Sequence, residues 1–206
     1  MKKKHPAIKA VIFDLGNVLV NYDVEKAAKR FSAASGLSTR EIWKRFFLSR
    51  FEQAFTRGDI STREFHRSAC ETLGVSIPLK VFSHYWNDIF WENPGMERLL
   101  VRIKKHYPLY LISNTNALHY NHIKKHFKLL RHFDRKFPSH EVGARKPDLR
   151  IYRRVLKKIG LRPEETVFID DMKSFILGAR KVGMHAIRFK GRLALLKSLR
   201  KLGIRF

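Results

Sequence analysis

Four places along the chain carry side chains capable of catalysis or ligand binding, three of them at the ends of apolar segments and one before an expected helix. The segment AVIF leads directly into Asp14, and Gly16 follows two residues later. A carboxylate at the end of a buried strand costs free energy unless a partner or ligand uses it. The other three places carry an acidic pair, a hydroxyl beside an amide, and an ammonium group: Asp170 and Asp171 in VFIDD, Ser113 and Asn114 in LISN, and Lys146 in GARKPD.

Together these side chains offer ligands for a metal ion and for a phosphate group. A small number of carboxylates suits Mg²⁺, which keeps several waters and takes substrate phosphate oxygens as further ligands. The hydroxyl, the amide and the ammonium suit the remaining phosphate oxygens. A carboxylate can also attack phosphorus and form an aspartyl-phosphate. The pattern indicates phosphoryl chemistry, provided that the fold brings the four segments together.

The elements that must position these residues alternate between strand and helix. The first strand ends at Asp14, and the same alternation continues through the C-terminal half. This order predicts an α/β fold, a Rossmann-like parallel sheet with helices on both faces, whose ligands bind at the carboxyl ends of the strands. Later strands are expected at 107–114, 132–137, 165–170 and 184–189, and helices at 115–129, 147–160, 172–182 and 192–202.

The segment 24–92 shows helical periodicity without an intervening strand. Ser38 with Glu41 and Ser61 with Glu64 have the spacing of capping boxes, which mark helix starts. We therefore expect an inserted helical cap domain over 17–92, lying over the carboxyl edge of the sheet. The α/β core domain is then expected over 1–16 and 93–206.

The order of four motifs resembles the haloacid dehalogenase superfamily, in its phosphatase branch with a small helical cap. The motifs are FDLGNVL, LISNTN, GARKPDLRIY and VFIDD, and with the cap the similarity covers nearly the whole chain. The resemblance implies a Mg²⁺-dependent phosphatase that hydrolyses a small phosphomonoester, with a sugar phosphate as the candidate, through an aspartyl-phosphate intermediate.

The resemblance also implies a set of metal ligands. Asp14 matches the nucleophile, which is also a Mg²⁺ ligand, and the backbone carbonyl of Gly16 matches a second ligand. Asp171 matches the metal-binding acid of the last motif. Asp170 stands beside it and completes the predicted metal set, supporting the metal through a water or by holding its ligands.

The remaining matched positions are those that hold phosphate. Ser113 and Asn114 would bind the transferring phosphoryl group. Lys146 would neutralise charge on the nucleophile and on the phosphate. The expected partner is a small phosphorylated metabolite.

Gly16 departs from many phosphatases of this superfamily, which have an aspartate here as general acid and base, a contribution of typically about 10²–10⁴-fold. Three interpretations follow. A phosphatase could use a leaving group that needs little protonation, or a water or cap residue instead. A 2-haloacid dehalogenase-type hydrolase needs no acid, but such enzymes lack the acidic pair that Asp170 and Asp171 form here. A non-catalytic or regulatory protein would bind a phosphorylated ligand without turnover.

Phe175 is a second departure. The family often has a polar residue near the start of the helix after VFIDD, where it helps to arrange the metal-binding acids. Here Phe175 occupies that place, and Ser174 is the neighbouring residue that could substitute for it.

Substrate specificity is expected to come from cap residues that face the sheet edge. No motif identifies these residues, and Arg50 is the one that would suit a second anionic group. The full set of candidates is Asn21, Tyr22, Trp43, Arg50, Phe51, Gln53 and Trp86.

Composition bounds the remaining possibilities. The 206 residues include 43 Lys and Arg against 18 Asp and Glu, a net charge of +25 that attracts anions in general. No recognition motif accompanies this charge, so specific nucleic-acid binding is not expected. The chain has no apolar stretch of the roughly 18 residues that a membrane span needs. One cysteine, Cys70, fits a cytoplasmic location, and we expect a monomer or a weak dimer.

Overall fold

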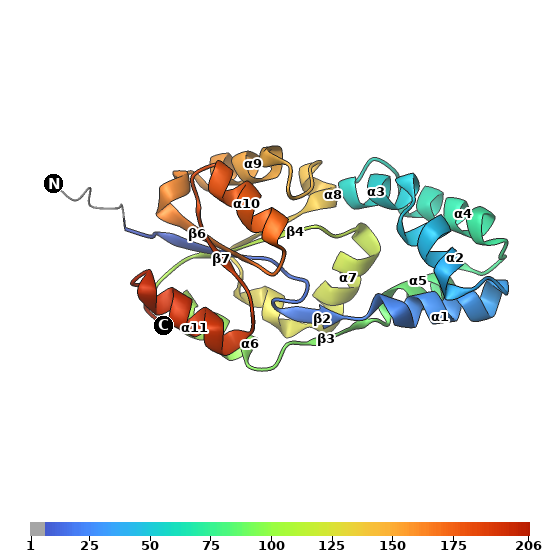
Figure 1. Ribbon diagram of the computed structural model, residues 1–206, viewed down its shortest axis with the longest axis horizontal. Coiled ribbons are helices and arrows are strands. Elements are labelled where there is room, and N and C mark those ends of the chain that lie inside the picture. The colour runs from blue at the N-terminus through green and yellow to red at the C-terminus, as the bar shows by residue number, and fades with distance from the viewer. Residues whose placement is uncertain (1–6) are drawn as a thin grey trace.

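Five strands form one parallel sheet in the order β5-β4-β1-β6-β7 (Figure 1). The computed structural model describes residues 7–206. Each strand hydrogen-bonds to its neighbours in parallel, and β5 and β7 are the two edge strands. The predicted α/β class is confirmed. The strands are β1 (Ala10–Phe13), β4 (Leu109–Ser113), β5 (Arg135–Pro138), β6 (Thr166–Asp170) and β7 (His185–Arg188).

Helices cover both faces of the sheet because the central strands are apolar on both faces (Figure 1). Phe13 and Val11 pack towards one face, and Ile12 between them packs towards the other. The first face is covered by α6 (Met96–Lys104), α7 (Ala117–His126) and α11 (Arg192–Lys201), and the second by α8 (Ser139–Val142), α9 (Leu149–Ile159) and α10 (Lys173–Lys181). Short 3₁₀ helices span Lys128–His132 and Pro163–Glu165.

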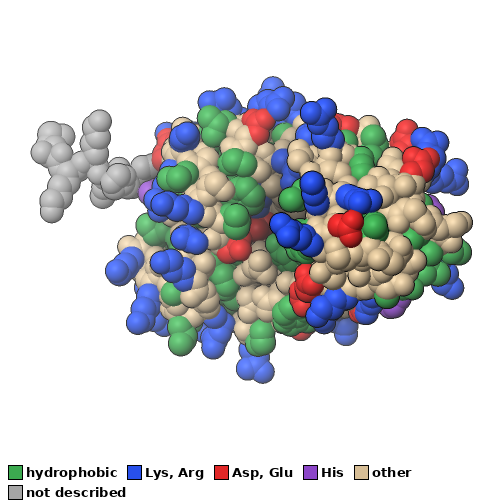
Figure 2. All heavy atoms as spheres, turned by 45° about the vertical axis from the view of Figure 1, so that its right-hand side comes forward, with side chains coloured by type: hydrophobic (Ala, Val, Ile, Leu, Met, Phe, Trp, Pro, Cys, Tyr) green, Lys and Arg blue, Asp and Glu red, His purple; other side chains and the backbone are tan. Residues whose placement is uncertain are grey.

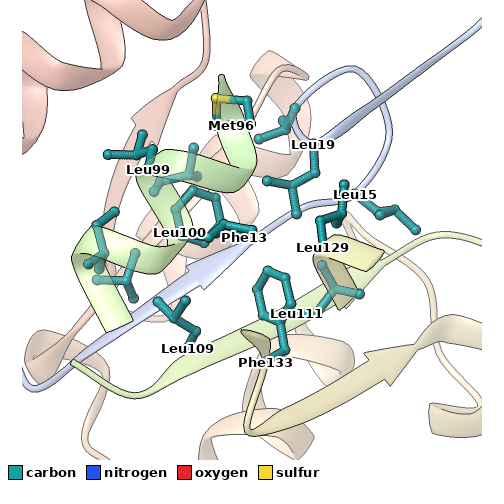
Figure 3. Packing of buried hydrophobic residues seen from close by; sticks show 14 of the residues in the cluster. Phe13, Leu15, Leu19, Met96, Leu99, Leu100, Leu109, Leu111, Leu129 and Phe133 are labelled. Atoms are coloured by element: carbon teal, nitrogen blue, oxygen red, sulfur yellow. The ribbon is translucent and has the colours of Figure 1, made fainter. Parts of the chain in front are cut away.

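The larger core cluster lies between the sheet and α6. Leu100 of α6 lies beside Phe13 of β1, and Leu111 of β4 belongs to the same cluster (Figure 3). These contacts fix the end of β1, which carries Asp14 into the site.

The helix expected at 147–160 begins two residues later, at Leu149. The Asp148 side chain caps it by accepting a hydrogen bond from the Arg150 backbone N–H at 2.8 Å. Gly160 ends the helix with a φ of 68°, a left-handed conformation that glycine adopts without strain. This start leaves Lys146 in the preceding loop, at the sheet edge.

The inserted segment is helical and has an aromatic core of its own. Both expected capping boxes are present, at Ser38 with Glu41 and at Ser61 with Glu64. The helices are α1 (Val24–Ser35), α2 (Thr39–Ile42), α3 (Arg50–Arg57), α4 (Thr62–Leu73) and α5 (Leu79–Asn87), with a π-helical turn at Trp43–Phe47. We call α1 to α5 the cap.

A two-stranded antiparallel ribbon joins the cap to the sheet domain (Figure 1). It consists of β2 (Val20–Tyr22) and β3 (Phe90–Glu92). The prediction of no strand within 24–92 is wrong at β3, because three residues are too few to show a period of two. The division into a core domain (1–16 and 93–206) and a cap (17–92) stays a prediction.

The cap also contacts the sheet domain at the C-terminal end of α3. The Ser139 hydroxyl, fully buried at the start of α8, donates to the backbone carbonyl of Thr56 at 2.6 Å. A Cβ atom on Gly58 would lie 2.1 Å from the backbone oxygen of His140, so only glycine fits. This contact holds α3 over the carboxyl edge of the sheet.

On the face shown in Figure 2, Lys and Arg side chains are scattered rather than gathered into one patch. Within residues 7–206, every helix is too short or too polar to cross a lipid bilayer. On this face the positive charge is spread over the surface and does not form a single basic patch.

Candidate active site

The carboxyl ends of β1, β4 and β6 bring the predicted residues to one place. Lys146 Nζ lies 2.7 Å from Asp14 Oδ1 and 2.6 Å from Asp170 Oδ2. Asp14 follows β1 and Asp170 ends β6, and these strands are neighbours in the sheet. Parallel pairing is therefore what makes residues more than 150 positions apart meet.

Burial makes this cluster strongly coupled. The side chains of Lys146 and Asp170 are fully buried, and that of Asp14 is nearly so. Burial raises the pKa of both carboxyls, while the Lys146 ammonium opposes that rise. The pKa of Lys146 is also raised, because two carboxylates outweigh its own burial.

Phe175 has a direct role in this cluster. The Lys146 ammonium lies 4.8 Å from the centre of the Phe175 ring and 5.4 Å from that of Phe168. A cation over an aromatic face is stabilised electrostatically. Ser174 is exposed and forms no side-chain hydrogen bond with residues 7–206. It therefore does not take over the role of the polar residue that the family often has at position 175.

The acids fit a divalent metal ion. One carboxylate oxygen each from Asp14, Asp170 and Asp171 lie within 4.8 Å of one another. Three carboxylates and the single ammonium of Lys146 leave two negative charges, which a divalent cation would neutralise. Oxygen donors of this kind are those that Mg²⁺ prefers.

Asp170 and Asp171 differ in how free their oxygens are. Asp170 accepts hydrogen bonds on both oxygens, from Lys146 Nζ and from the Met172 backbone N–H at 2.8 Å. Asp171 is partly exposed, and within residues 7–206 its side chain accepts one hydrogen bond, from Asn17 Nδ2 at 3.5 Å. Asp171 is therefore the more available ligand of the two.

Ser113 and Asn114 are neighbours in the chain but are used differently. The amide of Asn114 donates to the backbone oxygen of Lys146 at 2.9 Å and accepts from its backbone N–H at 2.8 Å. The buried Ser113 hydroxyl lines the cavity and has no hydrogen-bond partner among residues 7–206. Ser113 is free to bind a ligand, whereas the Asn114 side chain holds the backbone of Lys146. The predicted contact of Asn114 with phosphate stays a prediction.

The space beside Gly16 is filled by Tyr22. A Cβ atom on Gly16 would lie 2.8 Å from Cε1 of Tyr22. Gly16 does not have a positive φ, so its backbone alone would accept another residue. The ring of Tyr22 therefore occupies the direction in which an acid at position 16 would point.

A cavity of about 320 Å³ opens above these groups, between the sheet edge and the cap. Of the seven cap candidates, only Tyr22 lines it. Phe51 and Trp86 pack in the aromatic core of the cap, and Arg50 and Gln53 are exposed. The sequence analysis missed other polar residues that line the cavity, which are Glu52, Thr56, Thr115, Asn116, His119 and Arg145.

His119 lies where the sheet domain meets the cap. Its ring stacks on Trp86 of α5 with centroids 4.7 Å apart, and Nδ1 lies 2.9 Å from Asn87 Oδ1. Burial, aided by the nearby His122, lowers the pKa of His119 to about 3. The histidine is therefore neutral around pH 7.

The comparisons with known proteins agree with this geometry. D-ribitol-5-phosphate phosphatase of Bacteroides thetaiotaomicron is 25% identical over 88% of this chain and 91% of its own. Sesquiterpene phosphatase astK of Aspergillus oryzae is 26% identical over 94% of this chain and 96% of its own. Both curated relatives are phosphatases.

A solved structure extends the comparison to three dimensions. A haloacid dehalogenase family enzyme of Bacteroides thetaiotaomicron, in complex with magnesium and inorganic phosphate, has a TM-score of 0.82 and 28% identity, over 89% of this chain and 95% of its own. The family model described as haloacid dehalogenase-like hydrolase matches residues 8–183. The chain therefore belongs to the haloacid dehalogenase-like hydrolase family.

Proposed function

We propose that the protein is a Mg²⁺-dependent phosphatase that hydrolyses a small sugar or polyol phosphomonoester. The observation that carries this proposal is the cluster of Lys146 with Asp14 and Asp170. It places a carboxylate next to a buried cation in the wall of a cavity, which the Ser113 hydroxyl, without a hydrogen-bond partner among residues 7–206, also lines.

The proposed reaction has two steps. A carboxylate oxygen of Asp14 attacks phosphorus, the bond to the ester oxygen breaks, and an aspartyl-phosphate forms. Water then attacks the same phosphorus, phosphate leaves, and the Asp14 carboxylate is regenerated. The leaving oxygen takes its proton from a donor other than Gly16, which has none.

The other residues of the site stabilise charge or hold the reacting groups in place. Lys146 stabilises the charge that develops on the phosphoryl oxygens, and Ser113 donates its hydroxyl hydrogen to one of them. Asn114 holds the backbone of Lys146 in place. Mg²⁺, for which Asp14, Asp170, Asp171 and the Gly16 carbonyl are the proposed ligands, supplies further positive charge to the phosphate when it is bound.

The proposed substrate class rests on the size of the cavity and on the charged side chains in its lining. Its volume of about 320 Å³ suits a small metabolite. Apolar side chains such as Val24, Ile89 and Phe90 form much of the wall, and the charged Glu52 and Arg145 lie among them. The D-ribitol-5-phosphate phosphatase similar to this chain acts on a polyol phosphate by its name. We therefore place sugar and polyol phosphates ahead of hydrophobic esters.

The test is phosphate release from a set of phosphorylated metabolites and p-nitrophenyl phosphate, with and without Mg²⁺. Asp14→Asn should reduce release to background, because the amide is not an anionic nucleophile. Asp59→Asn, at an exposed cap acid, is the matched control and should keep activity. Chloride release from 2-chloropropionate in EDTA would instead support a dehalogenase, and an absence of both products would support a binding protein without turnover.

A further inference from the structure

Two charged side chains line the cavity apart from the Lys146 cluster, and they come from opposite sides. Glu52 belongs to α3 of the cap, and Arg145 lies in the loop just before Lys146. Both are partly buried. Neither side chain has a part in the phosphoryl steps above. Both can therefore contact the part of the substrate that lies beyond its phosphate group.

The hydrogen bonding of both side chains is incomplete. Glu52 Oε1 accepts a hydrogen bond from the Thr56 hydroxyl at 2.7 Å, which fixes the orientation of the carboxylate. Its second oxygen has no hydrogen-bond partner among residues 7–206, and neither does the guanidinium of Arg145. The cavity therefore offers a ligand one free hydrogen-bond acceptor, on Glu52, and several free donors, on Arg145.

Glu52 and Arg145 also act on each other. Burial raises the pKa of Glu52, and the charge of Arg145 opposes this rise, although no ion pair joins the two side chains. A gap thus remains between an anion and a cation. A group that fills it must accept a hydrogen bond from Arg145 and donate one to Glu52.

We propose that Glu52 and Arg145 bind hydroxyl groups on the carbon chain of the substrate and so select polyol and sugar phosphates over alkyl phosphates of equal length. This inference rests on the proposed phosphatase function.

Hydroxyl groups match the pair because each both donates and accepts. An alkyl or prenyl chain would displace water and leave both charges without partners, which costs free energy. A second anionic group would pair with Arg145 but would be repelled by Glu52. A neutral polyol satisfies both side chains.

The experiment compares ribitol 5-phosphate with 1-pentyl phosphate, which has the same number of carbon atoms and no free hydroxyls. The quantity measured is the ratio of kcat/KM for the two esters, with Mg²⁺ present. The wild type should prefer ribitol 5-phosphate by roughly 100-fold or more, since a site built to bind hydroxyls strongly rejects analogues without them. Glu52→Leu and Arg145→Met should each lower this ratio roughly 10- to 100-fold.

Matched controls are available on the same elements of the chain. Gln53→Leu changes an exposed neighbour of Glu52 on α3, and Arg153→Met changes an exposed arginine on α9. Both should keep the wild-type ratio. Glu52→Gln preserves the shape of the side chain and its acceptor for Thr56, so it should fold normally and still lower the ratio.

The outcomes separate this inference from the proposed function. A wild type that hydrolyses both esters equally, or variants that slow both esters by one common factor, would overturn the hydroxyl assignment while leaving the phosphatase intact. If p-nitrophenyl phosphate, ribitol 5-phosphate and 1-pentyl phosphate all release no phosphate, the phosphatase proposal fails and this inference fails with it.

Discussion

The sheet edge and the cap line the same cavity, but they hold their polar groups in different ways. At the sheet edge, Lys146 contacts two carboxylates directly, and Asn114 fixes its backbone. In the cap, Glu52 has one partner and one open oxygen, beside an apolar core rich in aromatic rings. The difference suggests that the sheet edge is organised before substrate arrives, whereas the cap side is completed by the substrate.

The largest effect is expected from removing the central cation of the sheet edge. Lys146→Met leaves Asp14 and Asp170 buried without a counterion, so the free energy of unfolding without Mg²⁺ should fall by about 3–5 kcal/mol. Phosphate release should fall by about 10²–10³-fold, the loss typical of a removed stabilising donor. Urea unfolding and steady-state assays measure the two effects.

Lys157→Met is the control for this change, since Lys157 is exposed on α9. It should alter neither quantity measurably. A Lys146→Met variant as stable and active as this control would remove the distinction between an organised sheet edge and an open cap side.

The next effect separates Asn114 from Ser113. Asn114→Ala removes two hydrogen bonds to Lys146, of 2.8 and 2.9 Å, and should cost about 2 kcal/mol of stability together with a drop in kcat. Ser113→Ala removes a hydroxyl without a protein partner, so stability should change by less than about 0.5 kcal/mol while KM rises. Equal destabilisation by the two variants would contradict the roles assigned here.

The boundary between the two regions should be sensitive to pH through His119. Its pKa is about 3 in the folded protein and 6.5 without the burial that lowers it. Below pH 6.5 His119 is therefore protonated in the unfolded chain but stays neutral in the native state. The free energy of unfolding consequently decreases as the pH falls from 6.5 towards 3. Between pH 7 and pH 5 the free energy of unfolding should fall by about 2 kcal/mol because of His119.

His119→Gln removes the titrating group and retains an amide near Asn87. Urea unfolding at both pH values should show a smaller loss for this variant than for the wild type. If wild type and variant lose the same stability between pH 7 and pH 5, His119 is not held neutral by burial.

The smallest effect concerns Gly16. Gly16→Asp adds a carboxylate that could protonate the leaving oxygen, but its Cβ would lie 2.8 Å from the ring of Tyr22. We expect no gain from the single variant on an alkyl phosphate. In a Tyr22→Ala background the gain should reach at most about tenfold, which is a change of about 1.4 kcal/mol in the barrier.

The turnover of the double variant is compared with that of Tyr22→Ala alone, because this comparison separates the effect of the new carboxylate from the loss of the ring. A large gain from Gly16→Asp in the presence of Tyr22 would show that the ring moves easily. In that case Tyr22 would not be what keeps position 16 free of a side chain.

The contrast between the two regions also explains what the sequence could predict. Asp14, Ser113, Lys146 and Asp170 stand at strand ends or beside a helix start, and a parallel sheet brings such positions together. The fold class was predictable for the same reason, since strands and helices alternate clearly along the chain.

The cap residues were not predictable in this way. Arg50, Glu52 and Gln53 lie within four positions on α3, and only the docking of that helix against α8 decides which of them faces the cavity. The role of Phe175 was equally hidden, because its contact with Lys146 joins two separate elements. The short strand β3 left no periodic pattern.

The most direct test of the whole account is to trap the phosphorylated enzyme. Wild-type protein with Mg²⁺ is mixed with a ³²P-labelled substrate ester, quenched in acid during turnover and digested with pepsin at acid pH, which preserves an acyl phosphate, and its peptides are mapped. We predict that the label lies on a peptide that contains Asp14, and that Asp14→Asn carries none. Label on another peptide, or turnover without any labelled enzyme, would contradict Asp14 as the nucleophile.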